Sequence, residues 1–106
     1  MSTPKADEAQ RMGLVNFVAP DALAAALEYA RDLAANVSPA SMAAIKRQLH
    51  AHADRDMRSA VDESMALMKA SFAHPDFKEG VSAYVQRRAP AFQGLGAGTI
   101  HQKLFG

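Results

Sequence analysis

Apolar residues recur with the period of an α-helix along most of the chain. The clearest case lies between Arg55 and Phe72, where the apolar positions are three or four residues apart. They are Met57, Val61, Met65, Met68 and Phe72. This spacing predicts an amphipathic helix with one continuous apolar stripe. A methionine-rich stripe is typical of an intrachain core, because Met fills irregular gaps, and a subunit contact is the alternative interpretation.

Four other segments carry helix signals at their ends or along one face. Pro4–Met12 reads as a short helix closed by Gly13, and Asp21–Asn36 is alanine-rich with leucines at helical spacing. A third helix is predicted from Ser38-Pro39 to about Asp54, with Ser38 as its N-cap. The last helix opens at Pro75 and is expected to end near Arg88, just before Ala89-Pro90.

One run, Leu14–Val18, has the composition of a strand and is closed by Pro20. So short a strand leaves its hydrogen-bonding groups unpaired unless other strands lie beside it. The predicted fold is therefore mainly all-α, with four to five helices and one short unpaired strand. The chain divides into a leader over residues 1–20, a helical segment over 21–88 and a flexible tail over 89–106, whose apolar residues are expected to dock on a surface.

The composition supports helix and excludes several classes of function. Ala occurs 23 times among 106 residues, whereas Val, Ile and Thr together occur 10 times. The balance of 12 basic and 11 acidic residues argues against a nucleic-acid binder, and the lack of cysteine excludes disulfides and thiolate sites. The apolar runs are shorter than the ~20 residues of a membrane span, and no signal peptide is apparent. We therefore expect a cytoplasmic protein with no membrane contact.

The candidate catalytic and metal-ligating residues do not form convincing sets. His50 and His52 are two positions apart on a helix, so they point to different sides and cannot share one ion. His50 and Asp54 share a face, but two ligands do not make a metal site. The chain has four glutamates, all predicted at exposed positions or near helix starts: Glu8, Glu28, Glu63 and Glu79. We predict no metal site and no catalytic residue.

The best ligand candidates lie in the last predicted helix. Tyr84 and Arg87 are three positions apart, so in a continuous helix they are neighbours on its surface. An aromatic ring beside a guanidinium suits a purine ring and its phosphates. The alternative is a tyrosine at the edge of the core and a solvated arginine.

Several stretches, in this order, resemble one known family. They are Ala-Asp-Glu-Ala-Gln-Arg-Met-Gly-Leu-Val-Asn-Phe-Val-Ala-Pro at 6–20, Ser38-Pro39 with Lys46, Phe-Lys-Glu-Gly at 77–80, and Ala-Tyr-Val-Gln-Arg-Arg-Ala-Pro-Ala-Phe at 83–92. Each stretch is moderately specific by itself. The ordered set covers residues 6–94 and resembles the crotonase (enoyl-CoA hydratase/isomerase) superfamily.

The resemblance implies the C-terminal third of such an enzyme. Members of the family fold as a spiral of βα repeats followed by a helical segment that mediates trimer formation. Residues 1–20 would then be left over from the catalytic core, and residues 21–88 would be an oligomerisation segment. The implied partners are acyl-CoA, as the substrate of the complete enzyme, and further copies in a trimer or a dimer of trimers, with no separate cofactor. The family's oxyanion hole and acid/base glutamates lie upstream, so we expect this chain to be inactive alone.

The resemblance also gives Tyr84 and Arg87 a role. In hydratases of the family, an aromatic and a basic residue of the last helix approach the adenine end of CoA, often on a neighbouring subunit. Tyr84 and Arg87 fall at those positions, where the family typically has Phe and Lys. Two other functions stay open: a self-associating helical interaction module without a catalytic role, and a free-standing helical bundle that binds a ligand unrelated to CoA.

Overall fold

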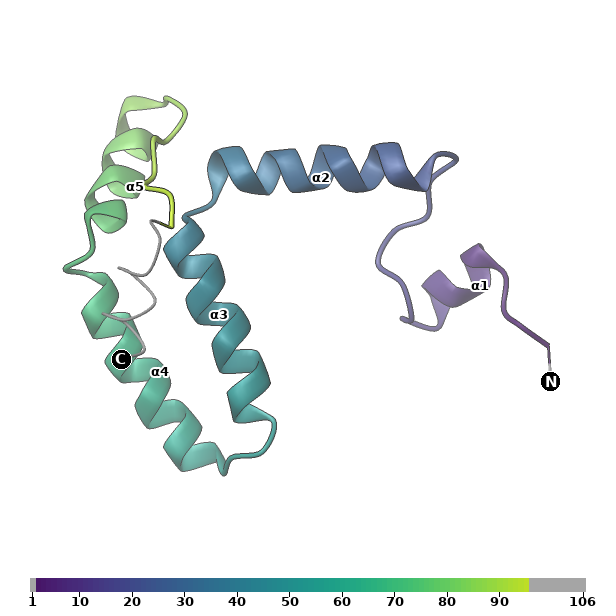
Figure 1. The fold of residues 1–106 in the computed structure, drawn as a ribbon, viewed down its shortest axis with the longest axis horizontal. Helices are drawn as coiled ribbons and strands as arrows, with labels where there is room; N and C mark the ends of the chain where they lie inside the picture. Colours follow the sequence, from purple (N-terminus) through teal and green to yellow (C-terminus); the bar gives the residue numbers. More distant parts are fainter. Residues whose placement is uncertain (1, 96–106) are drawn as a thin grey trace. The chain divides into compact units, whose positions relative to one another are not determined.

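The computed structural model describes residues 2–95 and is helical over that range (Figure 1). It contains α1 (Ala6–Arg11), α2 (Ala22–Asn36), α3 (Pro39–His52), α4 (Met57–Ser71) and α5 (Pro75–Gln86). The prediction of a mainly all-α fold with four to five helices is confirmed. The chain divides into two compact units, the first ending at Arg31 and the second beginning at Asp32. None of the helices described is both long enough and apolar enough to cross a membrane.

The first unit holds α1 and most of α2. The short helix α1 ends where Gly13 takes a left-handed conformation, with φ of 79°. The Gly13 amide donates to the carbonyl of Gln10 and the Leu14 amide to that of Ala9, at 3.0 and 2.9 Å. These bonds satisfy carbonyls that a helix end leaves free, and glycine adopts this conformation without a Cβ penalty. The predicted C-terminal cap at Gly13 is confirmed.

The strand predicted over Leu14–Val18 does not form, and that prediction is wrong. The segment is irregular, and its contacts include a hydrogen bond from the Gln10 side-chain amide (Nε2) to the Asn16 backbone carbonyl at 3.2 Å. The ring of Phe17 lies 5.8 Å from that of Tyr29, measured between centroids. A strand is stabilised by its ladder, and no strand occurs among residues 2–95 to provide one. The apolar composition of residues 14–18 is typical of a strand, but the described residues supply no second strand with which it could pair.

In the second unit, α3 and α4 form an antiparallel helical hairpin (Figure 1). Each helix begins at a polar cap, with Ser38 accepting from the Ser41 amide and Asp56 accepting from the Ser59 amide. These hydrogen bonds satisfy amides that the first turn cannot pair internally. At Asp56, the backbone and hydroxyl bonds from Ser59 hold the pKa of the carboxyl below its usual value. The hairpin is joined near its loop by an ion pair between Arg55 and Glu63.

The last described segment folds back along α5. Arg88 donates through two guanidinium nitrogens to the two carboxylate oxygens of Glu79, at 2.6 and 2.9 Å. The amide of Ala91 donates to the same carboxylate at 3.1 Å. The ring of the next residue, Phe92, lies against Gly80, where an added Cβ would sit 3.6 Å from the ring. We call the contacts of Glu79 with Arg88 and Ala91 the C-terminal clamp.

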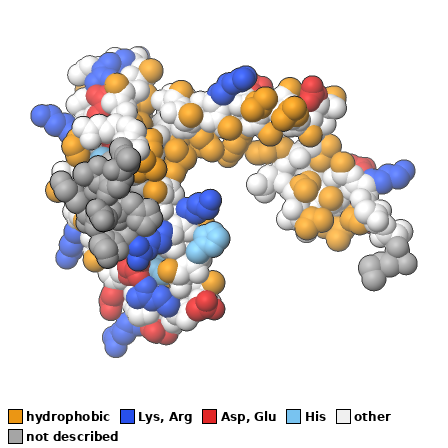
Figure 2. Space-filling model, in the orientation of Figure 1, with side chains coloured by type: hydrophobic (Ala, Val, Ile, Leu, Met, Phe, Trp, Pro, Cys, Tyr) orange, Lys and Arg blue, Asp and Glu red, His pale blue; other side chains and the backbone are white. Residues whose placement is uncertain are grey.

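Within the described residues, the buried apolar side chains are all small. They are Ala9 in the first unit and Ala40 and Ala83 in the second. The five residues of the methionine-rich stripe of α4 are between 45% and 79% exposed. On the face shown in Figure 2, hydrophobic side chains follow α2 along its length. Within the described residues, the α4 stripe is therefore left largely uncovered.

We expect the C-terminal clamp to weaken in acid. The Arg88 guanidinium and then the Ala91 amide lower the pKa of Glu79 to about 2 from its ordinary value of 4.5. Because the folded-state pKa is the lower one, the clamp's contribution is fully present above pH 4.5 and is lost as the pH falls towards 2. An NMR titration should give a midpoint near 2 for the Glu79 carboxyl carbon, and the Ala91 amide signal should move with it. In Glu79→Gln that amide should not respond over this range. A wild-type midpoint at 4.5 would contradict the clamp.

Candidate functional site

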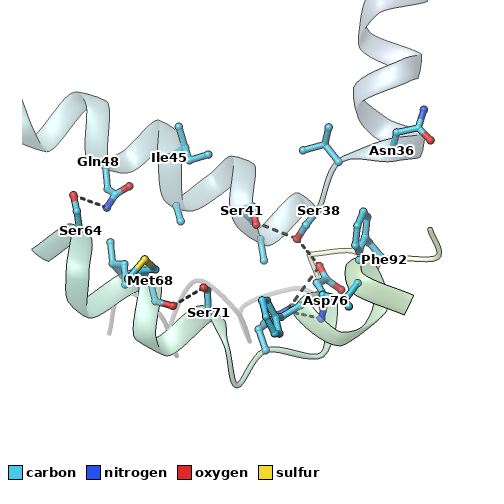
Figure 3. A pocket seen from close by; sticks show the side chains of 18 residues that line it. Asn36, Ser38, Ser41, Ile45, Gln48, Ser64, Met68, Ser71, Asp76 and Phe92 are labelled. Atoms are coloured by element: carbon cyan, nitrogen blue, oxygen red, sulfur yellow. Dashed lines mark hydrogen bonds and ion pairs between the residues drawn. The ribbon is translucent and has the colours of Figure 1, made fainter. Parts of the chain in front are cut away.

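A groove of about 590 Å³ runs between α3, α4 and α5 in the second unit (Figure 3). Its walls are largely apolar and come from all three helices and from the segment after α5. The apolar lining residues include Ala40, Ile45, Leu67, Met68, Phe77, Val81 and Phe92. The groove's size is within the usual range for ligand sites, so its polar groups decide what it can do.

The polar end of the groove is built around Asp76, which is only 6% exposed. The Ser38 hydroxyl donates to one Asp76 carboxylate oxygen at 2.5 Å, and the Gln93 amide donates to the other at 3.0 Å. Ser38, itself 8% exposed, accepts from the Ser41 amide at 3.3 Å. This polar hub joins the starts of α3 and α5 to the segment that follows α5 (Figure 3).

Ser38, His74 and Asp76 are residue types found in hydrolase triads, but their geometry is different. The Nδ1 atom of His74 accepts from the Asp76 amide at 3.1 Å and lies 3.8 Å from the Asp76 carboxylate. The Ser38 hydroxyl donates to the carboxylate and not to the imidazole. A serine nucleophile needs a base that takes its proton, and that base must be oriented by a third group. The hub therefore holds the second unit together rather than activating a nucleophile.

The histidines considered for metal binding lie near the opposite end of the α3–α4 hairpin, on different faces of α3. His52 lies 3.7 Å from the Glu63 carboxylate, which also pairs with Arg55. His50 instead lies on another face of α3, beside Lys46. Within residues 2–95, no group of three acidic, histidine or cysteine side chains is close enough to hold a metal ion.

The structure places Tyr84 and Arg87 at the exposed C-terminal end of α5. Tyr84 is 86% exposed. Arg87 ends the helix in a left-handed conformation, with φ of 53° and ψ of 45°. Its amide donates to the Tyr84 carbonyl, and the Arg88 amide donates to that of Ala83. The helical spacing that predicts adjacent side chains therefore stops before Arg87. Neither Tyr84 nor Arg87 is among the described residues that line the groove.

Sequence reasoning identified Ser38 as a helix cap, which the structure confirms, but not its bond to Asp76. The two residues are 38 positions apart, and only the packing of α5 beside α3 brings them together. A serine and an aspartate at two helix starts, each next to a proline, are the only local signal for the hub.

Comparison with known proteins identifies the family. The sequence profile of the enoyl-CoA hydratase/isomerase family matches residues 2–95. The chain therefore belongs to the enoyl-CoA hydratase/isomerase, or crotonase, family, and the resemblance read from the sequence is confirmed.

Relatives and a solved structure agree with this assignment. The chain is 35% identical over 92 residues to 2,3-dehydroadipyl-CoA hydratase of Escherichia coli, covering 84% of this chain and 35% of that protein. It is 37% identical over 90 residues to enoyl-CoA hydratase EchA19 of Mycobacterium tuberculosis, covering 83% and 34%. A crystal structure of a probable enoyl-CoA hydratase/isomerase from Mycobacterium abscessus matches with a TM-score of 0.80 at 30% identity, covering 88% and 39%. The chain thus spans about a third of the length of these curated relatives.

We expect replacement of Asp76 to destabilise the second unit. In Asp76→Ala the buried Ser38 hydroxyl and the Gln93 amide lose their acceptor, at a cost of about 1–3 kcal/mol in the free energy of unfolding. Urea unfolding followed by far-UV circular dichroism, at matched protein concentration, measures this change. Asp62→Ala removes a carboxylate from an exposed position of α4 and serves as the control. Equal midpoints for the two variants would contradict the role of the hub.

Proposed function

We propose that this chain is the C-terminal helical part of an acyl-CoA hydratase or isomerase of the crotonase family, and that it serves assembly rather than chemistry. The observation that carries the proposal is the set of large apolar side chains left exposed on its helices. In α4 alone, Met57, Val61 and Met65 are each close to half exposed or more. The residues matched by the family profile place these helices in a protein of that family.

The size of the hydrophobic effect explains why these faces need a partner. Burying one Leu, Met or Phe side chain contributes about 1.5–3 kcal/mol, whereas ordering each residue costs about 1–2 kcal/mol in backbone entropy alone. Buried alanines contribute little to that balance. The stabilisation available to α2 and α4 therefore lies in their exposed apolar faces, and contiguous exposed apolar surface marks an interaction site. We propose that further copies cover these faces, as a trimer or a dimer of trimers.

The acidic residues support the proposal that the chain is inactive alone. A general acid or base works best with a pKa near the operating pH, which burial and neighbouring charges arrange. Glu79 has a pKa of about 2 because Arg88 and Ala91 donate hydrogen bonds to it. Glu63 pairs with Arg55 on the surface of the hairpin. Both carboxylates hold segments together, and neither is suited to moving a proton on a thioester substrate.

Tyr84 and Arg87 are proposed as the CoA-binding residues of the assembled protein. Both side chains are exposed at the end of α5, where a ligand held by a neighbouring subunit has access to them. An arginine donates two parallel hydrogen bonds to a phosphate, and an aromatic ring stacks on a purine. The names of the two curated relatives describe hydratases of CoA thioesters, which supports CoA as the ligand class.

The exposed apolar faces also favour a second candidate, a self-associating helical module without any catalytic partner. The same stripes of α2 and α4 would then be its contact surface. The two candidates differ in CoA binding, which the first requires and the second does not.

A charge placed in the α4 stripe should break the assembly. We expect Met65→Asp to lower the sedimentation coefficient towards that of a single chain, because an unpaired carboxylate is costly in an apolar contact. Ala66→Asp adds the same charge one position further, away from the stripe, and should leave the assembly intact. Equal behaviour of the two variants would contradict assembly through this face. Neither the wild-type chain nor these variants should hydrate crotonyl-CoA faster than buffer without protein does.

The proposed CoA residues can be tested by calorimetric titration of the assembled chain with CoA. Arg87→Gly removes the guanidinium while keeping a residue that accepts the left-handed turn, and Tyr84→Ala removes the ring. Each variant should weaken CoA binding about tenfold, the size expected for one charged hydrogen bond or one stacked base. Arg58→Ala removes one positive charge from α4 and should have little effect. If Arg58→Ala weakens binding as much as Arg87→Gly, the binding is nonspecific.

A further inference from the structure

The apolar stripe of α4 contains three of the six methionines of the sequence. Met57 is 79% exposed, Met65 47% and Met68 45%. Residues three or four positions apart are neighbours on a helix surface, so the three side chains lie along one face of α4 together with Val61. The sequence has no cysteine, so methionine thioethers are its only sulfur groups. The stripe therefore places oxidisable sulfur on a face that is open to small solutes.

An exposed thioether reacts with a peroxide without help from other residues. A lone pair of the sulfur attacks one peroxide oxygen, so an S–O bond forms while the O–O bond breaks. The sulfur is oxidised by two electrons to the sulfoxide, and hydrogen peroxide is reduced to water. The product is a polar, chiral side chain in place of a flexible apolar one. Access of the peroxide to the sulfur is the structural requirement, and the exposed side chains of the stripe meet it.

A sulfoxide in this stripe has no polar partner among its neighbours on the same face. The side chains of Val61 and Phe72, the other two members, have no hydrogen-bond donor. Met65 and Met68 are three positions apart, so two sulfoxide oxygens would lie on one patch. Burying a polar group without a hydrogen bond is costly, whereas water satisfies it fully. Oxidation therefore favours the stripe in water over the stripe in a contact.

We propose that Met57, Met65 and Met68 are sites of modification by peroxide, and that their sulfoxides release the assembly of the chain. The inference rests on the proposed function, because it requires copies that meet through α4. It adds a covalent modification that controls this contact. Because the contact covers the sulfurs, peroxide reacts with separated chains, and the sulfoxides then keep those chains apart. Assembly and oxidation thus oppose each other by mass action.

Hydrogen peroxide treatment of the whole chain tests the proposal, with peptide mass spectrometry to locate the added oxygen and sedimentation velocity to measure assembly. We expect chains with three stripe sulfoxides to sediment as single chains. Oxidation of the stripe should be about tenfold slower at protein concentrations that give assembly than at concentrations that give single chains, with free methionine as the reference for peroxide reactivity. An assembly that persists with all three sulfoxides in place, or a stripe oxidised equally fast in both states, would overturn the proposal.

Matched variants separate the stripe from the other methionines. Leucine has nearly the volume of methionine and no sulfur, so the variant Met57→Leu, Met65→Leu, Met68→Leu should assemble and stay assembled in peroxide. The variant Met12→Leu, Met42→Leu removes sulfur outside the stripe and should dissociate as the wild type does. Equal dissociation of the two variants by peroxide would contradict the role of the stripe.

Reduction of the oxidised wild-type chain provides a test that needs no substitution. Treatment with the two methionine sulfoxide reductases, one for each sulfoxide epimer, should restore the original sedimentation coefficient. If the chain stays dissociated after its sulfoxides are reduced, the release has another cause and the proposal is wrong. A chain that is monomeric at every concentration before any peroxide is added contradicts the proposed function itself. The two failures are therefore distinguishable, because one is seen in the untreated chain and the other only after oxidation.

Discussion

The structure depends on one constraint, which is that its large apolar side chains find little cover within the described chain. Among residues 2–95 the buried apolar residues are alanines, while Leu23 on α2 and Met57 on α4 are more than two-thirds exposed. The helices are nevertheless strongly amphipathic, so the sequence keeps apolar faces that are costly in water. This combination is what an oligomerising segment requires, since its core is completed by surfaces from other chains. Membership of the hydratase/isomerase family and the limited share of its relatives' length that the chain spans agree with such a role.

With so small an apolar core, polar contacts position the elements of the second unit. Asp76 links the starts of α3 and α5 through Ser38 and fixes the following segment through the Gln93 amide. Glu79, about one turn after Asp76 in α5, holds the segment that follows α5 through its bonds with Arg88 and Ala91. Buried and charge-assisted hydrogen bonds are directional, so they specify one arrangement where apolar contacts would allow several. The exposed end of α5, with Tyr84 and Arg87, is held in place by this framework.

The helices and several of their ends were predictable because their signals are local. Ser38 before Pro39 and Gly13 after α1 work through bonds within a few residues, and the structure shows both. The strand at 14–18 failed because its stability depends on a partner that no local pattern can supply. Asp76 was recognisable only as a first-turn acid, since its bond to Ser38 spans 38 positions. The turn at Arg87 was also hidden, because a positive φ is uncommon outside glycine and gives no sequence signal at an arginine.

The central claim is that other copies of the chain cover its apolar faces, and the molar mass in solution tests this most directly. Light scattering on the purified chain over a tenfold concentration range distinguishes the alternatives. The account predicts one discrete species of about three or six times the 11.3 kDa chain mass across that range. A monomer that unfolds cooperatively at every concentration would contradict it, because such a chain would be stable with its apolar faces in water.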